Sequence, residues 1–124
     1  MTDVLIDSQC NQAFNITSST GSDFGSTNGI GYFEANGSSW PFENGLIMTS
    51  GDVANAPGPE SGVLLDGTYA WPGDGDLEAF IPGLNAGDTN NASIIEFEFV
   101  PVSNSMSFDF IFAAEEYGTF QCTF

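Results

Sequence analysis

Carboxylates are the only charged side chains in this sequence of 124 residues. The chain contains 17 Asp and Glu residues and no Lys, Arg or His, which gives a formal net charge of −17 at pH 7. No side chain can form a salt bridge with another, so the acids repel one another unless salt or bound cations screen them. Nucleic acid and anionic membrane surfaces are poor partners for such a chain, because basic residues bind both.

The side chains that most catalytic mechanisms need are missing. Without His or Lys, a Ser or Cys nucleophile has no base to activate it. Zinc sites need Cys or His ligands, and the chain has only two cysteines. Two carboxylates could hydrolyse a glycoside, but a large number of carboxylates does not by itself indicate such a site. We therefore expect a protein that is not an enzyme.

The oxygen-rich loops favour calcium over other metals. Ca²⁺ prefers six to eight oxygen ligands from carboxylates, amides and backbone carbonyls. Three segments gather such groups: the loop around Asp52, the "PGDGDLEAF" segment, and "GDTNNAS" together with a distant acidic pair near the end of the chain. The expected metal ligands are Asp52, Asp74, Asp76, Asn90, Glu115 and Glu116. The alternative for each segment is a solvated turn, because Asp, Asn and Gly are also turn residues.

The two cysteines, Cys10 and Cys122, lie near opposite ends of the chain. We expect a disulfide between them, and two unrelated thiols are the alternative. A bridge over so long a loop would stabilise the fold by about 4–5 kcal/mol in the chain-entropy model. It would also place the protein in an oxidising compartment.

Two tryptophans, Trp40 and Trp71, stand next to prolines in segments that read as loops. Exposed loop aromatics can stack on sugars or fill a pocket of a partner. The alternative is that they cover the edge of a hydrophobic core.

The strongest strand patterns come late in the sequence. In "SIIEFEFVPV", Ile95, Phe97 and Phe99 alternate with glutamates, which predicts a half-buried strand with one wet face. In "SMSFDFIFA", residues 105–113, phenylalanines again recur at every second position. The intervening "PVSNS" suits a turn, so we predict an antiparallel hairpin.

The rest of the chain reads as short strands separated by Gly, Asn and Ser. Residues 51–91 read as a long loop region in which "GDLEAFIPG" could hold one helical turn capped by Asp76. We find no internal repeat and no segment able to span a membrane. The predicted fold is a single all-β domain over residues 1–124, an antiparallel β-sandwich or jelly roll with long Gly-, Asp- and Asn-rich loops.

Three ordered segments resemble the choice-of-anchor L family of bacterial surface proteins. The segment "EFEFVPVSNSMSFDFIFAAEEYGTFQC" is similar to the central signature of that family, and "GLIMTSGDVANAPGPE" and "GDGDLEAFIPG…TNNASIIEFEF" are similar to two upstream blocks. Residues 1–44 match only loosely. The resemblance implies a secreted or cell-surface β domain on proteins with variable C-terminal anchoring modules. The family continues past the cysteine with a further strand segment, so we expect this chain to be truncated there.

Taken together, these features favour a calcium-stabilised, extracellular structural or adhesive module of a bacterial cell-surface assembly, with a filament subunit as one form. Its expected partners are further copies, bound through β-strand edges, and surface glycans. The alternative function is a calcium-dependent, lectin-like adhesin domain that binds glycans through Trp40 and Trp71.

Overall fold

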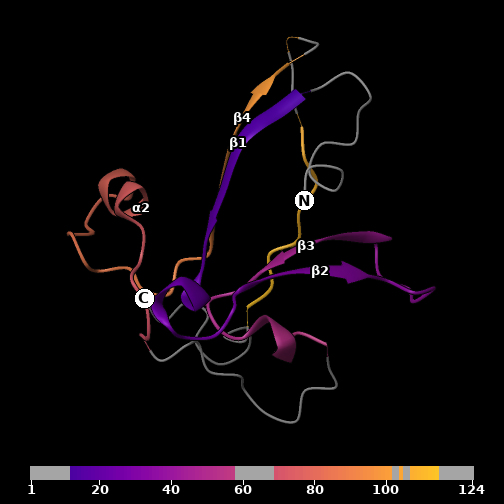
Figure 1. Cartoon of the computed structure of the whole chain (residues 1–124), viewed down its shortest axis with the longest axis horizontal. Helices are drawn as coiled ribbons and strands as arrows, with labels where there is room; N and C mark the ends of the chain where they lie inside the picture. Colours follow the sequence, from indigo (N-terminus) through magenta and orange to yellow (C-terminus); the bar gives the residue numbers. More distant parts are fainter. Residues whose placement is uncertain (1–11, 58–68, 102–103, 105–106, 115–124) are drawn as a thin grey trace.

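The computed structural model describes residues 12–57, 69–101, 104 and 107–114, and it is shown in Figure 1. Most of its regular structure is strand. The elements in chain order are β1 (Gln12–Ser19), the 3₁₀ helix η1 (Gly21–Phe24), β2 (Ile30–Glu34), β3 (Asn44–Met48), the 3₁₀ helix η2 (Val53–Asn55), the α-helix α2 (Gly75–Phe80) and β4 (Ile94–Val100). This content fits the predicted all-β class.

The described strands form two separate antiparallel pairs, β1–β4 and β2–β3. Figure 1 shows the two ribbons and the α2 segment extending in different directions. The sequence prediction of a sandwich or jelly roll is therefore confirmed only at the level of an all-β fold with antiparallel strands. No described helix is long and apolar enough to cross a bilayer.

Strand β4 shows the alternation that its sequence predicts. Glu96 and Glu98 are exposed, whereas Phe97 and Phe99 are partly buried on the other face, with ring centroids 6.1 Å apart. A strand with one apolar and one polar face is typical of antiparallel sheets. The prediction of a half-buried strand at this position is confirmed.

The partner of β4 differs from the prediction. β4 pairs with β1, and the described residues 107–113 of the expected second strand form no strand. The side chains of Phe108, Phe110 and Phe112 in that segment are 72%, 80% and 73% exposed. The hairpin prediction is wrong for these residues because an alternating pattern marks a segment that can pair but does not identify its partner.

A β-bulge adjusts the pairing of β1 with β4. Phe14 lies opposite Glu98 and Thr17 lies opposite Glu96, so Asn15 and Ile16 together face one residue of β4. Asn15 has a φ of 52°, and its side-chain amide donates a 2.7 Å hydrogen bond to the Glu98 carboxylate. Asn tolerates the left-handed region better than most residues, so this position suits a bulge.

The segments between the strands meet at a small polar hub formed by Thr20, Gly29, Thr49 and Ser93. The Thr20 hydroxyl accepts a 2.6 Å hydrogen bond from the Gly29 N–H, and the Ser93 hydroxyl donates a 2.8 Å bond to the Thr49 carbonyl. Thr20 and Gly29 are buried. Because the four residues come from segments far apart in sequence, the hub connects β1, β2, β3 and β4 near one end of each strand.

The long loop predicted over residues 51–91 is confirmed in the described parts, 51–57 and 69–91. These parts contain η2, α2 and one isolated bridge between Pro72 and Asn90, and no strand.

The hub generates a first prediction. A Cβ atom at residue 29 would lie 2.6 Å from the Thr49 carbonyl oxygen, so Gly29→Ala should destabilise the fold by about 1–3 kcal/mol through overcrowding. A Cβ at residue 75, in the first turn of α2, meets nothing within 4 Å. Gly75→Ala is the matched control and should cost nothing, because Ala favours a helix more than Gly does. Urea unfolding followed by tryptophan fluorescence measures both variants, and equal midpoints for the two would contradict the prediction.

Candidate functional site

The candidate site begins at the first turn of α2, where two of the predicted metal ligands lie. The Leu77 N–H donates a 2.9 Å hydrogen bond to the Asp74 Oδ1, which makes Asp74 the N-cap. Asp76 lies exposed inside the first turn. The sequence prediction of Asp76 as the cap is wrong by two residues. Asp74 is the cap because it immediately precedes the helix in an extended conformation, from which its carboxylate reaches the unpaired backbone N–H groups of the first turn.

A third carboxylate, Glu78 of α2, holds the loop that returns to β4. Its two oxygens accept a 2.6 Å hydrogen bond from the Thr89 hydroxyl and 2.9 Å bonds from the N–H groups of Thr89 and Gly87. The Thr89 hydroxyl bond, followed by the two backbone bonds, lowers the pKa of Glu78 below its ordinary value. The Glu78 carboxylate thus stabilises the loop that contains Gly87 and Thr89, although Glu78 belongs to the same acidic segment as Asp74 and Asp76.

Trp71 anchors the loop that leads into α2. Its indole N–H donates a 2.9 Å hydrogen bond to the Ala92 carbonyl, and its backbone exchanges bonds with Asn91. The side chain is 3% exposed, and it is the buried large apolar side chain of the described residues. A Cβ at residue 21 would lie 2.8 Å from the indole, so Gly21 permits η1 to approach it closely. These contacts fix the segment before α2 against the segment that enters β4.

We call these contacts around Trp71 the clamp. Asn91 completes the clamp, and its backbone conformation and side chain are unusual. It is 2% exposed, has a φ of 56°, and its Oδ1 accepts a 3.2 Å hydrogen bond from the Trp71 N–H. Its Nδ2 is buried and has no hydrogen-bond partner among the described residues. The sequence reasoning missed Asn91 and selected its neighbour Asn90, which is exposed and forms the bridge with Pro72.

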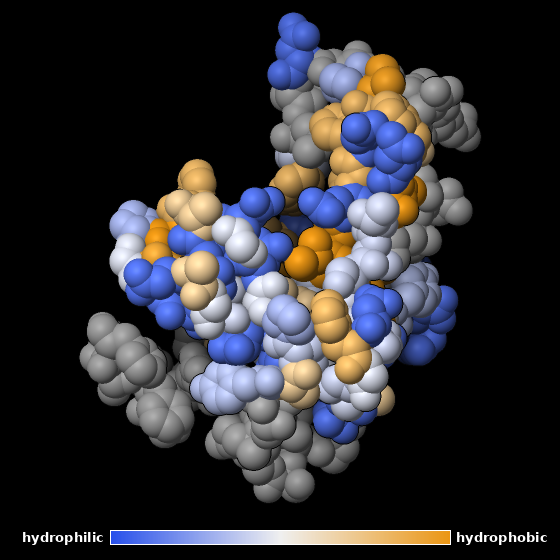
Figure 2. Space-filling model, turned by 60° about the vertical axis from the view of Figure 1, so that its left-hand side comes forward, coloured by the Kyte–Doolittle hydropathy of each residue, from blue (hydrophilic) through white to orange (hydrophobic). Residues whose placement is uncertain are grey.

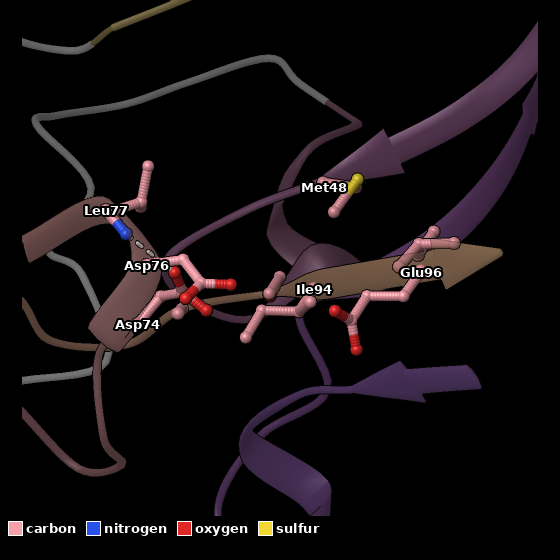
Figure 3. A pocket seen from close by; sticks show the side chains of 9 residues that line it. Met48, Asp74, Asp76, Leu77, Ile94 and Glu96 are labelled. Atoms are coloured by element: carbon pink, nitrogen blue, oxygen red, sulfur yellow. Dashed lines mark hydrogen bonds between the residues drawn. The ribbon is translucent and has the colours of Figure 1, made fainter. Parts of the chain in front are cut away.

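The clamp creates an open groove of about 400 Å³ between the start of α2 and the first half of β4. Figure 3 shows the carboxylates of Asp74 and Asp76 next to each other on the α2 side, with Ile94 between them and Glu96. Met48 at the end of β3 contributes to the lining, as do Leu77 and Ile95. In Figure 2 the hollow shows an apolar floor bordered by hydrophilic surface. We call this the acidic groove.

The acidic groove is lined by some of the predicted metal ligands but not by others. It contains Asp74, Asp76 and Glu96, of which Glu96 was expected only as part of a wet strand face. Asp52 does not line it. The Asp52 carboxylate accepts a 3.0 Å hydrogen bond from the Ala54 N–H and caps η2. Within the part of the chain that the structure describes, no group of three or more Asp, Glu, Cys or His residues is arranged to hold a metal ion.

Four of the predicted site residues lie outside the described residues. They are Glu115, Glu116, Cys10 and Cys122. The proposed ligand pair near the C-terminus and the disulfide therefore stay predictions.

The two tryptophans have different environments. Trp40 is 51% exposed, whereas Trp71 is buried with its N–H bonded. A ring with no accessible face cannot stack on a sugar. The expectation that Trp71 binds a glycan is thus wrong in this structure, and the alternative of a tryptophan that packs into the fold holds for Trp71.

The chain matches a known protein family. The family model described as Choice-of-anchor L domain matches residues 1–124, the whole chain. No curated protein and no solved structure matches the chain.

The cap geometry predicts different roles for two neighbouring acids. Asp74→Ala removes the acceptor of the Leu77 N–H and should destabilise the protein by about 1 kcal/mol, within a range of 0.5–2. Asp76→Ala should cost less, because Asp76 does not cap the helix. Urea unfolding of both variants measures the difference. A larger loss for Asp76→Ala would mean that the cap is assigned to the wrong residue.

The hydrogen bonds to Glu78 predict a pH-dependent contribution to stability. The pKa of Glu78 is lower in the folded than in the unfolded chain, so its contribution is present above the unfolded value of about 4.3 and is lost as the pH falls through the folded value. Glu78→Gln should therefore lower the free energy of unfolding at pH 7, and the gap from wild type should narrow at pH 3. Glu43→Gln on an exposed residue is the matched control. A gap of equal size at both pH values would contradict the assignment.

Proposed function

Because the chain belongs to the choice-of-anchor L family, we propose that it serves as a non-enzymatic, extracellular structural or adhesive module in an assembly on the bacterial cell surface. The match of the family model to the whole chain carries this proposal, since it indicates a bacterial surface-associated module. The lack of His and Lys supports a role without catalysis, because acid–base and nucleophilic mechanisms at neutral pH commonly use these residues.

Calcium is the proposed stabiliser of this module. The chain has 17 acids and no basic side chain to neutralise them, and two of the expected ligands, Asp74 and Asp76, lie side by side in the acidic groove. Carboxylates held together by the fold repel each other, and a bound hard cation would replace the repulsion by attraction. Asp52, Asn90, Glu115 and Glu116 complete the proposed ligand set, at this or at separate sites.

Strand edges are the proposed surfaces for assembly. Each of the two described sheets has only two strands, and such sheets gain stability when further strands extend them. Addition of strands from other molecules, between copies or from other proteins, would build a filament or another surface assembly.

The alternative function, calcium-dependent glycan binding, has less support. It relied on two tryptophans, and only Trp40 exposes its ring. A single exposed aromatic is common on protein surfaces and does not define a sugar site.

Thermal unfolding with and without calcium tests the stabilisation. At a free calcium concentration one hundred times the dissociation constant, binding contributes about 2.7 kcal/mol, which for a domain of this size raises the melting temperature by roughly 10 °C. Melting in excess chelator, at equal ionic strength, gives the reference and removes simple screening from the comparison.

Two variants of equal charge show where the ion binds. Asp76→Asn removes a carboxylate of the acidic groove without disturbing the cap, and it should reduce the calcium-induced shift. Glu43→Gln removes an exposed carboxylate elsewhere and should leave the shift intact. Identical melting curves in calcium and chelator would refute the calcium proposal while leaving the family assignment in place.

A further inference from the structure

The edge of β4 that does not pair with β1 is a strand edge for which the proposed function does not specify a partner. β4 pairs with β1 along one edge, and no other strand in the described part of the chain pairs with it. A strand edge presents a row of backbone N–H and C=O groups that can bind another strand. A two-stranded sheet is marginal by itself, whereas a third strand beside an apolar face makes it stable.

The side chains of β4 specify what such a third strand should look like. Phe97 and Phe99 lie partly buried on one face, and Glu96 and Glu98 lie exposed on the other. Side chains directly opposite each other on neighbouring antiparallel strands contact one another. An added strand therefore complements β4 best when it has apolar residues at every second position and cations at the positions between them.

The acidic groove extends the same chemistry beyond the strand. It runs along Ile94, Ile95 and Glu96 and adds the Asp74–Asp76 pair at the α2 side. A Lys or Arg side chain combines an apolar stem with a charged head, so it suits an apolar floor bordered by carboxylates. The β4 edge and the acidic groove therefore both favour a partner with basic side chains.

The composition of the chain makes its own copies a poorer source of this strand than a basic partner. A second copy has no Lys, Arg or His to place opposite Glu96 and Glu98, and its net charge of −17 would add repulsion. Like charges directly opposite each other destabilise strand pairing. The two glutamates thus disfavour acidic residues opposite them at this edge, and they favour a partner that supplies cations.

We propose that the edge of β4 not paired with β1 binds, by strand addition, a segment of alternating apolar and basic residues from a different protein. This inference deepens the proposed structural role, because it names the chemistry of the partner that joins the module to its assembly. It does not depend on calcium.

Peptide binding tests the proposal. The probe is a fluorescent seven-residue peptide of alternating Val and Lys, titrated with the whole chain in chelator and followed by anisotropy. Binding should occur, should weaken with rising salt, and should be absent for a twin with Glu in place of Lys. A third peptide carries N-methyl groups on alternate amides, so that it keeps its charge but cannot extend a sheet. It should not bind.

Two charge-matched variants locate the site. Glu96→Gln combined with Glu98→Gln should weaken binding roughly two- to thirtyfold, from the loss of two cross-strand charge pairs. Glu34→Gln combined with Glu43→Gln, at the β2–β3 hairpin, removes the same net charge and should change affinity less than twofold. The N-methyl comparison uses the wild-type chain, so it holds even if a variant folds poorly.

Several outcomes would overturn the proposal. They are no binding of the Lys peptide at millimolar concentration, equal binding of the N-methylated peptide, or equal loss in both double variants. Self-association of the chain that the Lys peptide reverses would identify a second copy as the occupant and would also overturn it. If the peptide fails to bind but calcium still raises the melting temperature, the proposed strand addition of a basic partner is refuted, and the proposed function stands.

Discussion

The burial of the Trp71 indole is the interaction on which the described structure depends. It is the one large apolar side chain that the described residues enclose, and the loops before α2 and before β4 are bonded to it or to its neighbours. Gly21 brings η1 against the same ring, and Asn91 takes up a left-handed backbone conformation to complete the contact. The acidic groove exists because this clamp holds the start of α2 near the start of β4.

Repulsion between the carboxylates is the second constraint on the structure. Backbone N–H groups of the chain offset part of it. Asp52, Asp74 and Glu78 each accept hydrogen bonds from backbone N–H groups, which substitute for the basic side chains that the sequence lacks. Such bonds favour the ionised carboxylate and fix the loops that carry it. Glu96 and Asp76, by contrast, direct their charge toward solvent and the groove. These described acids therefore divide into those that stabilise the fold and those that are available to a cation from outside.

The sequence predicts those features that follow from local rules. The alternation in β4 is visible in its residues because burial on one face and exposure on the other leave a pattern with a period of two. The proximity of Asp74 and Asp76 is equally local. The choice of β1 as the partner of β4 is not, because "QAFNITSS" has a weak pattern that is further interrupted by the bulge at Asn15 and Ile16. The environment of Trp71 is also unpredictable, since a Trp-Pro loop has the same composition whether the ring packs inward, as here, or faces solvent as Trp40 does.

The pairing of β1 with β4 has a consequence for the order in which the chain can fold. Asn15 and Glu98 bond to each other across 83 positions in the sequence. Contacts of such long range form late and slowly, because closing the loop costs entropy before any pairing repays it. During synthesis, β1 leaves the ribosome long before its partner exists, and it cannot adopt its final pairing until β4 has followed. The β1–β4 pair therefore forms only after β4 has been made, later than the β2–β3 pair, whose strands are close in sequence.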